Sequence, residues 1–169
     1  MTFVKNEIVI NLSRSELQMV NDVCAKFDES VKTNKHKPTF IHPYAPRATK
    51  VGIMAEVAFA QWSLFDYEYV RYQSQTDDVL GYQIKATERV DGSLIKQPHN
   101  PSGIYVLGIV NTTLNEVAFK GWMSSKEIQQ ECYWRSNVPK PGFFVPQSEL
   151  WSMSELTETK ELAAHRGAF

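Results

Sequence analysis

Residues 76–89 read TDDVLGYQIKATER and predict a strand over Tyr82–Thr87, entered through a tight turn at Gly81. Successive side chains of a strand point to opposite faces of a sheet. The apolar side chains of YQIKAT therefore share one face, which can pack beneath helices. The other face carries Gln83 and Lys85 side by side, and we expect them to project from a central strand.

A helix of about residues 49–65 precedes this strand and contains the run VGIMAEVAFAQWSLF, residues 51–65. Its apolar residues follow the i, i+3, i+4 spacing and continue around the opposite side, so the helix should be largely buried. Its only charged residue is Glu56. Burying a carboxylate is costly unless it is paired or coordinates a metal. Glu56 is therefore either a metal ligand or the partner of a lysine at the edge of the core.

The remaining elements predict an α/β fold, with a mixed central β-sheet flanked by helices. Ser13 and Glu16 have the spacing of a capping box, which opens a helix through about Ser30. The closely spaced middle strands favour antiparallel pairing. The other predictions are strands at 8–12, 67–72, 104–110 and 117–122, a loop over 33–48, and helices at 124–133 and 152–167.

Length and composition predict one domain that buries a substantial core. The chain has 169 residues, of which 43% are hydrophobic and 12% aromatic. No apolar run approaches the roughly 18 residues that a membrane span needs, and the first residues do not form a signal peptide. The cysteines are Cys24 and Cys132, too few for a disulfide scaffold. We therefore expect a cytoplasmic protein without a membrane partner.

Basic residues are concentrated in one segment, although the net charge is only -1. Residues 31–55 contain no Asp or Glu, so a local positive surface is predicted there, suited either to phosphate contact or simply to solvation. The basic residues of this segment are Lys32, Lys35, Lys37, Arg47 and Lys50.

The polar residues around the predicted strand could hold a divalent cation. An aspartate at the turn, an amide two residues before a lysine, and that lysine supply hard oxygen ligands and a nearby positive charge, which suits Mg²⁺. Asp77 and Asp78 compete for the aspartate position, and strand alternation through the turn does not decide between them. Both aspartates therefore stay candidates from the residues alone. The alternative is a solvent-facing strand with no site.

Glu56 in GIMAEVAFA, followed by Asp78, Gln83 and Lys85 in DVLGYQIKAT, resembles the PD-(D/E)XK nuclease superfamily, in particular its small phage-type members. The resemblance covers about residues 49–156. It implies a single restriction-endonuclease-like domain, with an N-terminal strand, helix and basic loop over 1–48 and a C-terminal helix over 152–169. A phage-encoded protein would act in the host cytoplasm.

The resemblance also implies a chemistry, namely hydrolysis of phosphodiester bonds in nucleic acid, with DNA as the expected substrate. Glu56, Asp78 and Gln83 would hold Mg²⁺, for which Mn²⁺ can substitute, and Lys85 would orient the attacking water. Gln83 departs from the Glu or Asp that most members carry, and no proline precedes the aspartate. The basic segment and Arg89 would contact nucleic acid. The alternative is a catalytically weak or inactive module that binds nucleic acid or a protein, and a homo-oligomer remains open.

Overall fold

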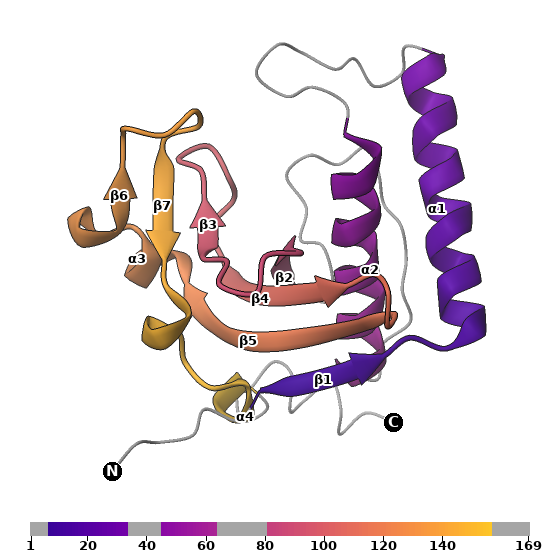
Figure 1. Ribbon diagram of the computed structural model, residues 1–169. Helices are drawn as coiled ribbons and strands as arrows, with labels where there is room; N and C mark the ends of the chain where they lie inside the picture. Colours follow the sequence, from indigo (N-terminus) through magenta and orange to yellow (C-terminus); the bar gives the residue numbers. More distant parts are fainter. Residues whose placement is uncertain (1–6, 34–44, 64–80, 157–169) are drawn as a thin grey trace.

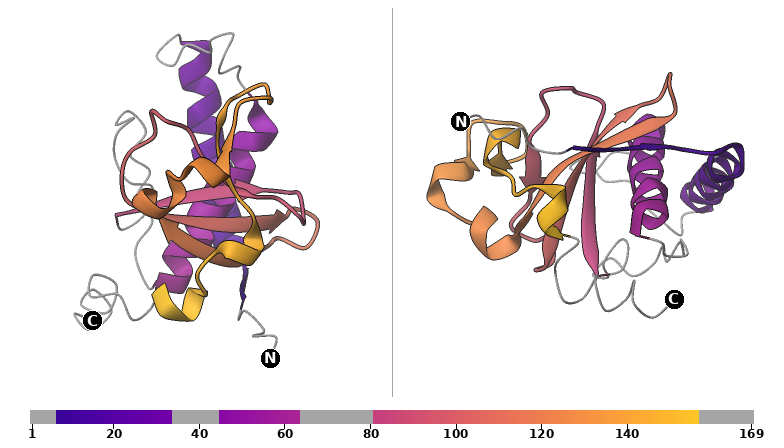
Figure 2. Two further views of the ribbon diagram at one scale, coloured as in Figure 1. Left: turned by 90° about the vertical axis from the view of Figure 1, so that its left-hand side faces the viewer. Right: turned by 90° about the horizontal axis from the view of Figure 1, so that it is seen from below.

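The computed structural model describes residues 7–33, 45–63 and 81–156, which form a mixed α/β fold with two β-sheets (Figure 1). Helices α1 and α2 lie on one side of the larger sheet, and the smaller sheet lies on the other side (Figure 2). Within the described ranges, no helix combines the length and apolar character that a bilayer crossing requires. The elements are β1 (Ile8–Asn11), α1 (Arg14–Lys32), α2 (Pro46–Ser63), β2 (Tyr82–Thr87), β3 (Leu94–Lys96), β4 (Ile104–Asn111), β5 (Glu116–Ser124), α3 (Ser125–Ile128), η1 (Glu131–Tyr133), β6 (Trp134–Arg135), β7 (Gly142–Val145), η2 (Gln147–Glu149) and α4 (Met153–Leu156).

The larger sheet has the strand order β1-β5-β4-β2 and is mixed, as expected. β5 pairs antiparallel with both β1 and β4, whereas β2 pairs in parallel with β4. The expectation of antiparallel pairing is therefore wrong for β2. The physical reason is the crossover through residues 88–103, which contribute β3 to the other sheet before the chain returns as β4. β2 also ends the order of the described strands, so the expectation of a central strand is not met among them.

Helices α1 and α2 form an antiparallel pair, in which α2 lies on the larger sheet and α1 packs on the outer side of α2 (Figures 1 and 2). The Ser13 hydroxyl accepts the backbone N–H of Glu16, and the Glu16 carboxylate accepts the backbone N–H of Ser13, so the predicted capping box is confirmed. α2 begins at Pro46, inside the segment predicted as loop. A proline fits the first helical position because its missing N–H would have no partner there.

The main core lies between α2 and the sheet. Between Val51 and Ala60 every residue of α2 except Gly52 and Glu56 is buried, which confirms the expectation from the all-round apolar sequence of this stretch. The Phe59 ring packs on Tyr82 of β2 with centroids 5.4 Å apart and on Phe119 of β5 at 5.7 Å. These contacts fix the helix above β2, β4 and β5.

The smaller sheet has the order β3-β7-β6, and its strands run across the direction of β4 and β5 (Figure 1). A second core joins it to the face of the larger sheet that points away from α2, through Leu94, Tyr105, Leu107 and Val145 among others. The helix predicted through Tyr133 ends earlier, because after Ile128 the chain becomes polar and exposed and offers no second apolar turn. The predicted strand at 67–72 and the end of the last predicted helix lie outside the described residues.

Candidate active site at strand β2

The two faces of β2 separate as the alternation predicts. Tyr82 and Ile84 are buried in the main core with α2, and Ala86 packs against the same core. Gln83 and Lys85 therefore point to the opposite face. Gln83 is only 3% exposed, and Lys85 is half-buried. The structure thus places this pair beside the second core rather than on a freely solvated strand face.

The Lys85 ammonium lies over the ring of Tyr105, 5.7 Å from its centroid. Tyr105 sits on β4 beside Gln83 in the parallel register, is fully buried, and donates a hydrogen bond from its hydroxyl to the Pro101 carbonyl at 2.5 Å. A cation over an aromatic face within about 6 Å is attracted by the ring quadrupole. Tyr105 therefore supports the position of the Lys85 side chain.

A second lysine, Lys96 on β3, approaches the same ring, with its ammonium 5.9 Å from the Tyr105 centroid. Lys96 is 1% exposed, and its ammonium donates to the carbonyl oxygens of Gln97 at 3.2 Å and Asn100 at 3.1 Å. Burial lowers the pKa of Lys96, and the nearby charge of Lys85 lowers it further. Two lysines thus share one tyrosine beside Gln83.

Lys96 and Tyr105 were not identified from the sequence. β3 has only three residues, which is too short for its alternation to be recognised beside the turn-forming residues around it. Tyr105 lies in the apolar strand segment YVLGIV, where a tyrosine is an ordinary core residue. Only the packing of β3 over β4 identifies the two residues as neighbours of Lys85.

Glu56 lies half-buried on α2. The helix and the strand run antiparallel, because Phe59 packs on Tyr82 near one end and Arg47 binds Glu88 at the other. Glu56 precedes Phe59 by three residues, about 4.5 Å along the helix axis. It therefore lies about one helical turn from the residue of α2 that packs on the first residue of β2.

Glu56 and the side chain of Gln83 nevertheless lie on opposite sides of strand β2. α2 covers the face of β2 that carries Tyr82 and Ile84, whereas Gln83 points to the other face. An ion shared by the two would have to lie beside the outer edge of β2. Both offer the hard oxygen atoms that Mg²⁺ prefers, so the donor chemistry fits this ion.

Asp78, the third expected ligand, lies outside the described residues, as does its competitor Asp77. Among the residues that the structure describes, no group of three or more His, Cys, Asp or Glu side chains could hold a metal ion. The described portion therefore provides an incomplete ligand set, Glu56 and Gln83, together with the lysine pair.

Arg47, which we expected to contact phosphate, pairs with a carboxylate in the structure. Its guanidinium binds both oxygens of Glu88, with Nε 2.6 Å from Oε2 and Nη2 2.7 Å from Oε1. The Thr112 hydroxyl donates to the same carboxylate at 3.1 Å. Hydrogen bonding by Arg47, with a smaller contribution from Thr112, lowers the pKa of Glu88 against an opposing desolvation effect. Arg47 therefore ties the start of α2 to the end of β2.

The other expected nucleic-acid contacts are distributed around the surface. Lys32 and Lys50 are exposed on α1 and α2, while Lys35 and Lys37 lie outside the described residues. Arg89 is exposed, 3.6 Å from the carboxylate of Asp91. Lys32 and Lys50 lie toward the same end of the helix pair (Figure 1), the end at which the expected basic surface would lie.

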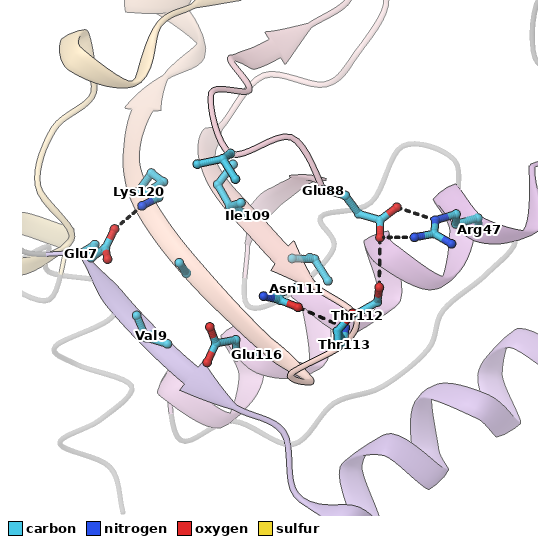
Figure 3. A pocket seen from close by; sticks show the side chains of 13 residues that line it. Glu7, Val9, Arg47, Glu88, Ile109, Asn111, Thr112, Thr113, Glu116 and Lys120 are labelled. Atoms are coloured by element: carbon cyan, nitrogen blue, oxygen red, sulfur yellow. Dashed lines mark hydrogen bonds and ion pairs between the residues drawn. The ribbon is translucent and has the colours of Figure 1, made fainter.

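A pocket of about 470 Å³ opens beyond the carboxyl end of β2 (Figure 3). Two ion pairs lie along its walls, Arg47 with Glu88 and Lys120 with Glu7. Glu116 adds a third carboxylate to the lining. The basic groups drawn in this pocket are therefore already paired with carboxylates, and its chemistry does not favour a phosphate group.

Comparisons of the chain with protein-family models, with curated proteins and with solved structures find no match. The function is therefore inferred from the residues and their arrangement.

Proposed function

We propose that this protein is a magnesium-dependent nuclease that hydrolyses phosphodiester bonds, with DNA as its substrate and a restriction-endonuclease-like fold. The observation that carries the proposal is the common face of Gln83 and Lys85 on β2, with Glu56 on α2 about one helical turn from Phe59, which packs on Tyr82. A mixed sheet packed against α2 is consistent with this fold. An oxygen ligand and a lysine on one strand face can hold a metal ion and orient an attacking water, which suits hydrolysis of a phosphodiester.

In this proposal Glu56, Asp78 and Gln83 hold Mg²⁺. When bound, the ion lowers the pKa of a coordinated water and offsets negative charge on the phosphate. Lys85 orients the attacking water and donates a hydrogen bond to a phosphate oxygen as its charge increases. Tyr105 keeps the Lys85 ammonium in place through its ring. The buried Lys96 adds a second positive charge to the same region.

The direct test is cleavage of plasmid DNA and of a single-stranded oligonucleotide with Mg²⁺ or with EDTA, using the wild type and Lys85→Ala. We expect cleavage only with Mg²⁺. The Lys85→Ala variant should be about 100- to 1000-fold slower, by analogy with removal of one preorganised donor at a developing charge. Folding should be unaffected, because Lys85 is half-buried and lies at the end of the described strand order.

Lys126→Ala is the matched control, since Lys126 is an exposed lysine on α3, which follows β5 and is separated from β2 by β4. It should cleave like the wild type. Wild-type rates in Lys85→Ala, or equal losses in both variants, would contradict the assigned role of Lys85.

A second candidate function is binding of nucleic acid without turnover. Gln83 favours it, because an amide offers an oxygen but no negative charge, and metal affinity falls with fewer charged ligands. This function predicts salt-dependent DNA binding that is the same with Mg²⁺ and with EDTA, and no cleavage with either. The cleavage assay separates the two functions directly.

A further inference from the structure

A continuous row of side chains crosses the smaller sheet, starting at the lysine pair. Lys96 on β3 lies opposite Phe143 on β7, and Phe143 lies opposite Trp134 on β6. Directly opposed residues of neighbouring strands share a face. The rings of Trp134 and Phe143 are in contact, with centroids 5.0 Å apart in an edge-to-face arrangement. The row therefore runs from the Lys85–Tyr105–Lys96 group to Trp134.

The row becomes more exposed toward its outer end. Lys96 is buried, Phe143 is half-buried, and Trp134 is 37% exposed on a strand that ends the smaller sheet. Burial of an aromatic ring is strongly favourable, so a tryptophan left partly open on a sheet surface provides a ready contact area. Arg135 is exposed next to it, and its guanidinium donates to the carbonyl oxygens of Cys132 at 3.2 Å and Trp134 at 3.0 Å.

Two exposed basic side chains accompany this ring. Residues 132–148 contain Arg135 and Lys140, and the carboxylates of Glu131 and Glu149 flank this segment at its two ends. Both basic residues are exposed. A basic side chain next to an exposed aromatic ring can bind single-stranded nucleic acid, because the cation contacts a phosphate while the ring stacks on a base.

We propose that β6 forms a stacking platform on which Trp134 binds one unpaired base of a single-stranded nucleic acid, with Arg135 on a neighbouring phosphate. This inference rests on the proposed function, since it takes the strand to continue to the phosphodiester at Lys85. Neighbouring strands lie about 4.8 Å apart, so the backbones at Lys96 and Trp134 are separated by about 10 Å. That distance spans about three stacked nucleotides at 3.4 Å each.

Single-stranded nucleic acid is the occupant that this geometry favours. In a duplex the faces of each base are covered by its neighbours in the stack, so an indole ring on a sheet surface reaches only an unpaired base. Stacking is tolerant of sequence because every base has a π-face. The platform therefore predicts that the protein prefers single-stranded to duplex nucleic acid and has little preference for base sequence.

The test measures binding of a fluorescein-labelled oligo(dT) and of a duplex of the same length by fluorescence anisotropy, in EDTA so that no cleavage occurs. Loss of one stacked base is worth about 1–3 kcal/mol, which corresponds to about 5- to 150-fold in affinity. We expect Trp134→Ala to weaken oligo(dT) binding by a factor in this range and to leave duplex binding within about twofold. Trp134→Phe keeps a stacking ring and should retain most of the affinity.

Trp151→Ala is the matched control, because Trp151 is another exposed tryptophan, 46% exposed, whose ring packs near Trp122 rather than in this row. It should bind oligo(dT) like the wild type. Equal binding by Trp134→Ala and the wild type, equal losses in both alanine variants, or no binding of oligo(dT) by the wild type would overturn the platform.

Failure of the platform and failure of the proposed function give different results. Selective loss of oligo(dT) binding in Trp134→Ala, with no Mg²⁺-dependent cleavage by the wild type, supports the platform and rejects the nuclease. Mg²⁺-dependent cleavage by the wild type, with unchanged oligo(dT) binding in Trp134→Ala, supports the nuclease and rejects the platform.

Discussion

Lys96 is a charged residue in an environment that should destabilise the folded protein. It is buried, and its two hydrogen bonds go to backbone carbonyl oxygens of Gln97 and Asn100. A buried charge costs free energy unless it is well compensated. Proteins keep such destabilising residues mostly at functional sites. We therefore interpret Lys96 as a residue retained for its charge beside Lys85 and Tyr105.

Replacement of Lys96 by Met tests this interpretation. Met keeps the stem volume and removes the charge, so the free energy of unfolding at neutral pH should stay within about 1 kcal/mol of the wild type or increase. DNA cleavage should nevertheless slow. The pKa of Lys96 is lowered in the folded protein. At a pH between this lowered pKa and the ordinary lysine pKa of the unfolded chain, the unfolded chain therefore binds more protons than the folded protein. Wild-type stability should therefore gain from Lys96 as pH rises through this window, and the Met variant should lack that gain.

Denaturant unfolding at pH 7 and at about pH 9.5, with cleavage assays on the same samples, provides the measurement. A Met variant that is several kcal/mol less stable at neutral pH would identify Lys96 as a structural residue. DNA cleavage by Lys96→Met at the wild-type rate would show that Lys96 has no role in the active site.

For individual residues, the sequence predicted which face of the strand a side chain points to, but not which residues it contacts in the fold. The period of two placed Gln83 and Lys85 on one face, because that alternation is local to YQIKAT. The contact of Lys85 with Tyr105 depends on the register between β2 and β4, and that of Lys96 depends on the packing of a second sheet. Neither is encoded in a local period.

Helix α2 and strand β2 form the unit that carries the candidate ligands. The unit is held near one end by Phe59 against Tyr82 and at the other by Arg47 against Glu88. Glu56 and Gln83 lie between these two contacts. The helix was predicted from its apolar residues, but its start was not, because Pro46 and Arg47 were assigned to a basic loop.

The Arg47–Glu88 pair predicts an acid dependence of this unit. Arg47 holds the pKa of Glu88 below its ordinary value, so the stability that the pair supplies is present above the ordinary carboxyl range. It is lost as pH falls through the lowered pKa of Glu88. In Arg47→Gln the pKa of Glu88 should return upward, and this loss should begin at a higher pH. The change in stability should be small, because both side chains are partly solvated.

A carboxyl titration by NMR in the wild type and in Arg47→Gln reports the Glu88 pKa directly. Arg89→Gln is the control, since Arg89 neighbours Glu88 in sequence but lies near Asp91. An equal Glu88 pKa in all three proteins would contradict the pair. Weaker DNA binding in Arg47→Gln with no change in the Glu88 pKa would restore Arg47 to the nucleic-acid surface.

The whole molecule places its candidate chemistry between two sheets. α2 covers one face of the larger sheet, with α1 packed on its outer side, and the smaller sheet covers the other face (Figure 2). The mixed larger sheet was predicted because its strands are long enough to show apolar runs. The smaller sheet was not predicted, since its strands have two to four residues and β3 pairs with β7, which is distant from it in the sequence.

The central claim is that Glu56 belongs to a magnesium site, and thermal unfolding of the wild type and Glu56→Gln with Mg²⁺ and with EDTA tests it most directly. A ligand that binds only the folded state stabilises it by about 2.7 kcal/mol at a hundredfold excess over Kd, or about 5–10 °C for a chain of this size. We expect this increase in the wild type and in the control Glu149→Gln, whose exposed carboxylate lies far along the chain in η2. Glu56→Gln should show no increase. An equal shift in all three proteins, or no shift in the wild type, would contradict the claim.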